Sequence, residues 1–258
     1  MNSYIAVNIT TLPQFTIGSV YFAKPMDATQ LHTFVRGLQC ETVANNAFAR
    51  IEKLRQSFET PAGMSVTTLQ EYDSLLCHLQ NALSDSKFPS RFGWTLQTQK
   101  KKSGFLTEST MLVNEDFESD TVEFERCHIL YNLGLLLFRQ ANTLAMSTNT
   151  TNQAKALFLQ AAGVFSTASQ FASQTGLTKQ VTDSQLMLDV SKGCAQLCMY
   201  LKGLSTGVSL GVREKLAGGA HQLLVTAPKP IANFAGAVAH IAAAMSAEDV
   251  VEYGTALS

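Results

Sequence analysis

The stretch of sequence that decides the fold is FERCHILYNLGLLLF, residues 124–138. Its second half is apolar at nearly every position, and a helix that is apolar on all sides belongs inside a protein. Upstream, Asp120 stands three residues before Glu123, which is the spacing of a capping box at a helix start. We therefore expect a helix from about residue 120 to 146 at the centre of the fold.

Amphipathic helices are expected on both sides of this central helix. Apolar residues recur there at steps of three and four, the repeat of a helix with one buried face. Pro61 and Gly63 break the first run and indicate a helical hairpin, while Pro228 and Pro230 separate the last two helices. The helices are expected at residues 43–58, 66–83, 150–171, 182–201, 208–225 and from 231 onward.

Period-two alternation predicts a small sheet beside these helices. Residues 4–9 alternate and indicate a short, half-buried strand at the N-terminus. A second alternation starts at Phe92 and is followed by another β-prone run, so a hairpin is expected near residues 90–113 with its loop at 100–104. The expected fold class is mainly α, with successive helical hairpins in a tetratricopeptide-like stack, a small antiparallel sheet and one domain over residues 1–258.

Composition and charge narrow the class of protein. The chain has 19 basic and 20 acidic side chains, so its net charge of −1 excludes a strongly basic nucleic-acid binder. The first ten residues lack a signal-peptide pattern, and the longest apolar stretches are shorter than the ~20 residues that cross a bilayer. Five cysteines in apolar helical patterns indicate free thiols in a reducing, cytoplasmic compartment. They are Cys40, Cys77, Cys127, Cys194 and Cys198.

Two overlapping matches to the serine-hydrolase pattern GxSxG cover residues 203–211 and would use Ser205 or Ser209 as the nucleophile. His221 and His240 follow downstream. A nucleophile elbow requires a strand before the serine, whereas the preceding residues here have helical spacing. A serine hydrolase is therefore the remote alternative, and we expect no catalytic residues.

A metal site can be imagined from two other groups of residues. Cys194 and Cys198 lie one helical turn apart, and Cys127 adjoins His128. Both groups continue apolar helical stripes, which favours buried packing over metal binding. Because glycine-rich phosphate loops and HExxH pairs are also missing from the sequence, we expect neither a metal nor a cofactor.

Two surface features remain as candidate binding sites. Val208, Val212 and Leu216 step by four and form one stripe. Such a stripe is more often core than binding site, but the polar and charged residues around it favour a place where a partner helix lies against the protein. These surrounding residues are Lys202, Arg213, Glu214 and Lys215.

The second surface feature is basic. Lys100, Lys101 and Lys102 stand in a segment that lacks acidic residues, and the default interpretation is a solvated hairpin tip. The sharper hypothesis is a membrane-contact loop, in which this tip touches an anionic membrane and Phe105 inserts into it.

The sequence also resembles a known family. Residues 124–136, followed by Gln140 and Ala141, resemble the central helix signature of the Bro-one (BRO1-like) domain, the amino-terminal module of Alix-type scaffolds. Supporting similarity lies at residues 4–7, 69–76, 87–89, 92–94 and 161–165. The resemblance implies a helical solenoid with a tetratricopeptide-like core and a small three-stranded sheet.

The function that this resemblance implies is binding, in a cytoplasmic adaptor that is recruited to endosomes. Bro-one domains hold the C-terminal amphipathic helix of an ESCRT-III subunit, charged multivesicular body protein four, in a hydrophobic surface groove during multivesicular body sorting. The groove positions carried over to this chain are Met199, Lys202, Val208, Val212 and Leu216.

The sequence departs from the family pattern at two points. Met199 stands where an aromatic residue is common, although a flexible Met also fills such a site. Family domains continue for several long helices after the position of Glu252 and Tyr253, whereas this sequence ends at Ser258. We therefore expect a domain without its last helices and an incompletely covered apolar face over residues 231–245. The alternative function is a helical scaffold that has lost ESCRT-III binding and serves another partner or a signalling role.

Overall fold

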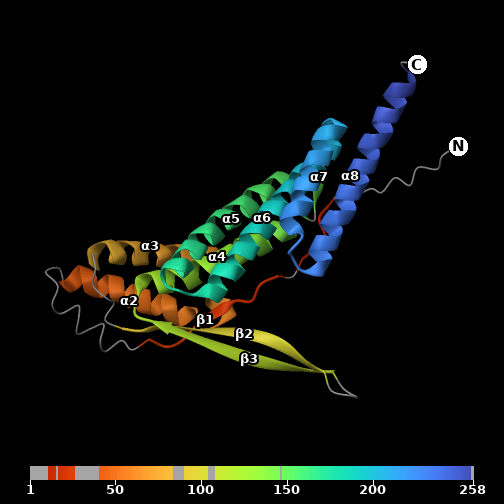
Figure 1. Cartoon of the computed structure of the whole chain (residues 1–258). Coiled ribbons are helices and arrows are strands. Elements are labelled where there is room, and N and C mark those ends of the chain that lie inside the picture. The colour runs from red at the N-terminus through yellow and green to blue at the C-terminus, as the bar shows by residue number, and fades with distance from the viewer. Residues whose placement is uncertain are drawn as a thin grey trace. The chain divides into compact units, whose positions relative to one another are not determined.

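The computed structural model describes residues 11–15, 17–26, 41–83, 90–145 without 104–107, and 147–256. Seven α-helices and three strands lie within these residues (Figure 1). The helices are α2 (Glu41–Ser57), α3 (Val66–Leu83), α4 (Val122–Leu144), α5 (Thr151–Gln174), α6 (Thr178–Ser205), α7 (Leu210–Leu224) and α8 (Lys229–Ala256). The strands are β1 (Tyr21–Ala23), β2 (Phe92–Ser103) and β3 (Glu108–Ser119). The expected mainly α fold with a small antiparallel sheet is confirmed.

The chain forms two compact units, a sheet unit and a helical unit. The sheet unit contains Gly18–Leu136 and Val164–Ser184. The helical unit contains Met1–Ile17, Leu137–Gly163 and Gln185–Ser258. Helices α4, α5 and α6 each contribute residues to both units.

The sheet has the strand order β1-β2-β3, with both neighbouring pairs antiparallel. The alternating strand predicted at residues 4–9 lies outside the described residues, and the first strand of the sheet is β1. The loop predicted at 100–104 is wrong, because Lys100, Lys101 and Lys102 belong to β2 and pair with β3. Main-chain pairing extends β2 beyond the point where its apolar alternation stops, and side-chain periodicity does not report such pairing.

The core of the sheet unit gathers aromatic rings on the first half of α4. The His128 ring stacks on Trp94 with 5.6 Å between the ring centroids, and Tyr21 meets the same histidine edge-on at 4.8 Å. Each of these three side chains is fully buried. Most of the 124–136 part of the apolar segment is therefore buried in the core of this unit, as its composition predicts.

A buried ion pair lies in the same core. The Arg55 guanidinium donates to the Glu125 carboxylate, which also accepts hydrogen bonds from the Tyr72 hydroxyl at 2.8 Å and the Trp94 indole at 2.6 Å. A second Arg55 nitrogen donates to the Gly93 carbonyl at 2.9 Å. Burial raises the pKa of Glu125, and the neighbouring guanidinium opposes that shift. The cluster joins residues of α2, α3, β2 and α4 and has a structural role.

The N-cap of helix α4 lies one residue later than predicted. Thr121 precedes the first helical residue, and its hydroxyl oxygen accepts a hydrogen bond from the Phe124 amide at 3.3 Å. Thr121 is therefore the N-cap residue, in place of Asp120. A threonine hydroxyl satisfies one of the free amides at a helix start in the same way as an aspartate.

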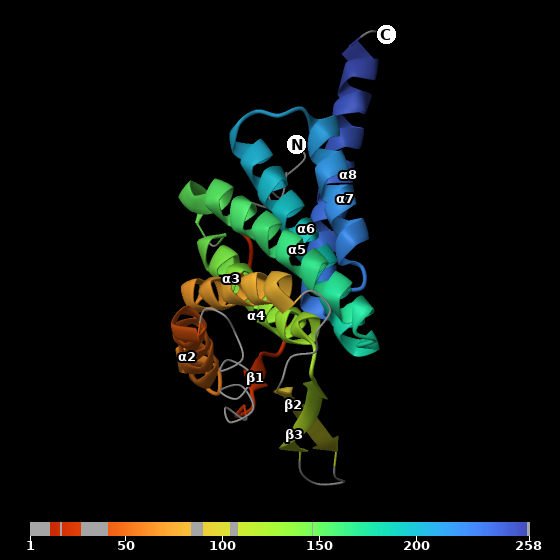
Figure 2. The same cartoon turned by 90° about the vertical axis from the view of Figure 1, so that its left-hand side faces the viewer.

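In the helical unit, α7 and α8 lie side by side (Figure 2). The buried face of α7 consists of Ala217, Ala220 and Leu224. The buried face of α8 consists of Ile231, Ala235, Val238 and Ala242, spaced by three and four residues. The first part of the predicted apolar face of α8 is thus covered, whereas Met245 remains exposed.

One described helix is long and apolar enough to cross a membrane, judged only by its length and composition. This segment is Lys229–Ala247 of α8, of which 22% is buried inside the structure. The sequence expectation counted a shorter stretch because it excluded the flanking residues. Length and composition of a single helix do not establish a membrane span, so the segment carries no functional argument.

Candidate partner-binding surface

The surface predicted to bind a partner lies at the turn between α6 and α7 in the helical unit. Gly207 follows the end of α6 with a φ of 70°, and the Val208 amide donates to the Gly203 carbonyl at 3.3 Å. This is a Schellman ending, which requires a left-handed residue and therefore favours glycine. Ser209 then precedes α7, and its carbonyl accepts hydrogen bonds from the amides of Val212 and Arg213.

This turn corrects the helical placement of one predicted site residue. Val208 lies in the connection and not in the first turn of a helix, since α7 begins at Leu210. The step-of-four stripe therefore holds for Val212 and Leu216 alone. Val208 packs instead against the end of α6, because its Cβ lies 3.5 Å from the position that a side chain on Gly203 would occupy. The step of four from Val208 to Val212 was coincidental, because the left-handed Gly207 ends α6 and α7 begins only after Val208.

Close approaches at two glycines align α6 and α7. A Cβ on Gly219 would lie 2.7 Å from Gln196 Oε1, and one on Gly203 would lie 3.4 Å from Arg213 Cγ. From the first contact to the second, the residue number rises from 196 to 203 on α6 and falls from 219 to 213 on α7, so the two helices run antiparallel. Met199 lies between the two contact points on α6, and Leu216 lies between them on α7. The fold thus places these two predicted residues at the same level of adjacent helices.

The predicted side chains differ in exposure. Val212 is 47% exposed and Met199 is 38% exposed, so both present apolar surface to the solvent on adjacent helices. Leu216 and Val208 are half-buried, and Lys202 is exposed. The surface therefore combines accessible apolar groups with a cation on the last turn of α6.

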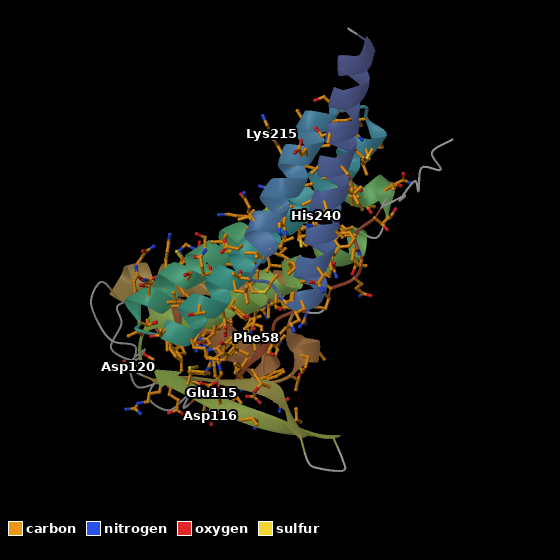
Figure 3. The ribbon with its side chains drawn as sticks, turned by 45° about the vertical axis from the view of Figure 1, so that its right-hand side comes forward. Phe58, Glu115, Asp116, Asp120, Lys215 and His240 are labelled. Atoms are coloured by element: carbon orange, nitrogen blue, oxygen red, sulfur yellow. The ribbon has the colours of Figure 1, made fainter. Side chains whose placement is uncertain are left out.

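Basic residues outnumber acidic ones around these apolar groups. Lys202 and Lys215 are exposed, Arg213 is half-buried, and Glu214 is the one acidic residue among the charged neighbours that the sequence indicated. Figure 3 shows Lys215 projecting from α7. Such a surface favours a partner helix with an apolar face and acidic residues beside it.

Sequence reasoning missed the residues that set the helix spacing at this surface. Gln196 and Gly219 were not singled out, although both lie where α6 and α7 approach. The pair Gly218-Gly219 inside a helix is a signal that could have found them, because glycine is unfavourable there unless another element needs the space.

The serine-hydrolase alternative lacks its required geometry. Ser205 belongs to the last turn of α6, where its hydroxyl donates to the Lys202 carbonyl at 2.9 Å, and Ser209 precedes α7. Helix α6 leads into Ser205 and the turn after α6 leads into Ser209, so a strand precedes neither serine. His221 is half-buried with its ring near Gly236 of α8, while His240 is exposed on α8 (Figure 3).

The cysteines considered as metal ligands are buried thiols. Burial raises the pKa of Cys127 and of Cys198 to about 12, and it also raises the pKa of Cys194. Within the described part of the chain, no three His, Cys, Asp or Glu side chains are grouped to hold a metal ion. His128 binds the Phe124 carbonyl through Nδ1 at 2.8 Å and packs among aromatic rings. Cys40 lies outside the described residues.

The three lysines of the predicted membrane-contact loop lie in strand β2 and not in a loop. Lys100, Lys101 and Lys102 stand opposite Met111, Thr110 and Ser109 in the far half of the β2–β3 hairpin. Phe105 lies outside the described residues. Contact of this end of the hairpin with a membrane stays a prediction.

Comparison with known proteins gives one finding. A family model described as BRO1-like domain matches residues 28–233, a segment that includes every described helix from α2 to α7. A search of curated proteins gives no match. BRO1-like domains are scaffold and adaptor modules of ESCRT-related function. Because the match covers well over half of its residues, the chain belongs to the BRO1-like domain family.

Proposed function

We propose that this protein is a non-enzymatic adaptor that binds the amphipathic C-terminal helix of an ESCRT-III subunit of the charged multivesicular body protein four type. In this proposal it acts in multivesicular body sorting as a cytoplasmic protein recruited to endosomes. Family membership supports the proposal in general terms. The observation that assigns the proposed binding to a particular surface is the exposure of Val212 and Met199 on adjacent helices.

The proposed contact follows the helix-in-groove mode. An amphipathic helix presents apolar residues at steps of three and four, which would cover Met199, Val212 and the exposed part of Leu216. Complete burial of one such side chain is worth about 1.5–3 kcal/mol, so these partly exposed groups together support moderate affinity. Lys202 and Lys215 would meet acidic residues at the rim, where each pair adds up to about 1 kcal/mol.

A fluorescence-polarisation titration of the purified chain with the ESCRT-III helix peptide tests this assignment. Val212→Asp places a carboxylate in the apolar contact, and we expect a loss of at least about tenfold in affinity. Leu216→Asp should act in the same direction. Leu112→Asp is the matched control, because Leu112 is 59% exposed on β3 in the sheet unit. Circular dichroism of each variant checks that the fold is retained.

Equal affinity of Val212→Asp and the wild type would remove the groove assignment. If a folded wild-type chain binds no ESCRT-III helix, the alternative of a scaffold that serves another protein partner replaces the proposal. The methionine at position 199 is the residue that favours this alternative, since the family pattern has an aromatic residue there.

We also propose a peripheral contact with anionic endosomal membrane through Lys100, Lys101, Lys102 and Phe105. Clustered lysines attract anionic lipids, and an aromatic residue inserts at the membrane interface. This contact would add to the affinity of the protein for the site where ESCRT-III assembles.

A further inference from the structure

The β3 strand forms the outer border of the three-stranded sheet (Figure 1). It pairs with β2 without a break from Glu108, opposite Ser103, to Ser119, opposite Phe92. No strand pairs with its other side among the residues that the structure describes. A border strand of this kind offers a row of main-chain donors and acceptors to another extended chain.

Carboxylates flank this free edge on both faces of the sheet. Asp116 and Glu118 lie on one face, where they meet Lys24, and Glu115 lies on the other, where it meets Lys179. Figure 3 shows Glu115 and Asp116 on β3. Their side chains keep exposures of 46% for Glu115, 55% for Asp116 and 48% for Glu118. Three accessible carboxylates thus face two lysines, and the edge keeps a negative charge.

Three of the usual protections of a border strand, which are a lysine, a proline and a bulge, are absent from residues 112–119, LVNEDFES. This segment contains neither lysine nor proline, and its register with β2 has no bulge. A second copy of the same edge, paired antiparallel about a two-fold axis, would bring carboxylates opposite carboxylates. Like charges in facing positions destabilise a strand pair, whereas basic residues there stabilise it.

We propose that β3 is the docking edge for an extended, lysine- or arginine-rich segment of a partner protein. The segment adds to the sheet as a fourth strand through main-chain hydrogen bonds. Its basic side chains lie opposite Glu115, Asp116 and Glu118, which select it over neutral or acidic strands. This interaction is independent of the helix-binding surface proposed above.

The test uses the full chain and a labelled peptide of about nine residues, a strand length, in which lysine alternates with threonine and valine. One matched peptide carries N-methyl groups on alternate main-chain amides, and another has glutamate in place of lysine. We expect binding of the basic peptide alone, with an affinity at least about tenfold above that of either control. Hydrogen exchange should show new protection of amides within residues 112–119.

A variant with Glu115→Gln, Asp116→Asn and Glu118→Gln should bind the basic peptide several-fold more weakly and with a smaller salt dependence. Val212→Asp, in the other unit, should bind it like the wild type, which separates this inference from the proposed function. Equal binding of the N-methylated peptide would overturn the proposal, because strand pairing would then play no part. The peptide controls need no change in the protein, so a variant that fails to fold does not block the test.

Sedimentation of the chain alone tests whether a second copy of the chain occupies the β3 edge. We expect a monomer over the concentrations used for peptide binding. A dimer that the basic peptide does not dissociate would assign the edge to a second copy of the chain and would overturn the proposal.

Discussion

The side chain of Asn132 in helix α4 pairs with the main chain of Tyr21 in strand β1. Asn132 Oδ1 accepts a hydrogen bond from the Tyr21 amide at 3.0 Å, and Nδ2 donates to the Tyr21 carbonyl at 2.8 Å. One amide side chain thus satisfies both main-chain groups of a buried strand residue, as a neighbouring strand would. This explains a polar residue in the middle of an apolar helix.

The pairing predicts a large loss of stability for Asn132→Leu. The substitution keeps the volume but leaves the Tyr21 N–H and C=O buried without these partners, at about 1–3 kcal/mol for each group. Urea denaturation should therefore show an unfolding free energy lower by about 2–6 kcal/mol. The exposed Asn152, in α5, provides the control Asn152→Leu, which should change stability little. Equal stability of the two variants would refute the structural role of Asn132.

Two ion pairs of the sheet unit should respond differently to loss of their carboxylate. Glu125→Gln leaves the fully buried Arg55 without its counter-charge, which costs about 3–5 kcal/mol. Glu71→Gln breaks the bidentate pair with Arg50 on the surface, where water screens both charges, so the loss of stability should be much smaller. Denaturant titration of both variants measures the contrast. Similar losses would mean that burial does not set the strength of these pairs.

Acid should weaken the fold through His128. Burial lowers the pKa of His128 from 6.5 to about 4. Between these two pH values the unfolded chain binds a proton that the folded chain excludes, so the unfolding free energy falls as the pH falls from 6.5 toward 4. The loss of unfolding free energy caused by His128 is of the order of 3 kcal/mol once the pH has fallen to about 4, and there is no loss above pH 6.5.

The measurement for His128 is the unfolding free energy across this pH range. His128→Gln should show a flatter pH dependence, and His240→Gln, at an exposed position of α8, serves as the matched control. An unchanged slope in His128→Gln would show that other groups cause the acid response.

A pair of glycines in adjacent helices should give opposite results when replaced by alanine. A Cβ on Gly134 would lie 2.7 Å from the ring of the buried Phe165, so Gly134→Ala should destabilise the protein by about 1–3 kcal/mol. A Cβ on Gly163 would meet nothing within 4 Å, so Gly163→Ala should stabilise it by up to about 1 kcal/mol through helix propensity. Thermal unfolding of both variants decides the signs. A stabilising Gly134→Ala would mean that α4 and α5 can separate without loss.

The membrane hypothesis makes a separate prediction. Phe105→Ala should reduce co-sedimentation with anionic vesicles, and joint replacement of Lys100, Lys101 and Lys102 by glutamine should reduce it further. Neutral vesicles are the control, because attraction of the lysines requires anionic lipid. Unchanged co-sedimentation of both variants would remove this hypothesis.

Prediction from the sequence worked best where the signal is local. The helices of the hairpin at 43–58 and 66–83 correspond to α2 and α3 because each has its own apolar face and a proline–glycine break between them. The central helix was found because a fully buried helix has few polar positions. At the candidate surface, Val212 and Leu216 were identified by their spacing, while the place of Val208 depended on a left-handed glycine that spacing does not report.

The sequence by itself determined the helices, the presence of a β-hairpin and the family, because periodicity and motifs are written in residues close together in the chain. Tertiary structure alone decided that β2 continues through Lys102, that Asn132 completes β1, and that Met199 lies level with Leu216. Each of these depends on groups far apart in the chain, and main-chain pairing and burial become defined only when folding brings such groups together.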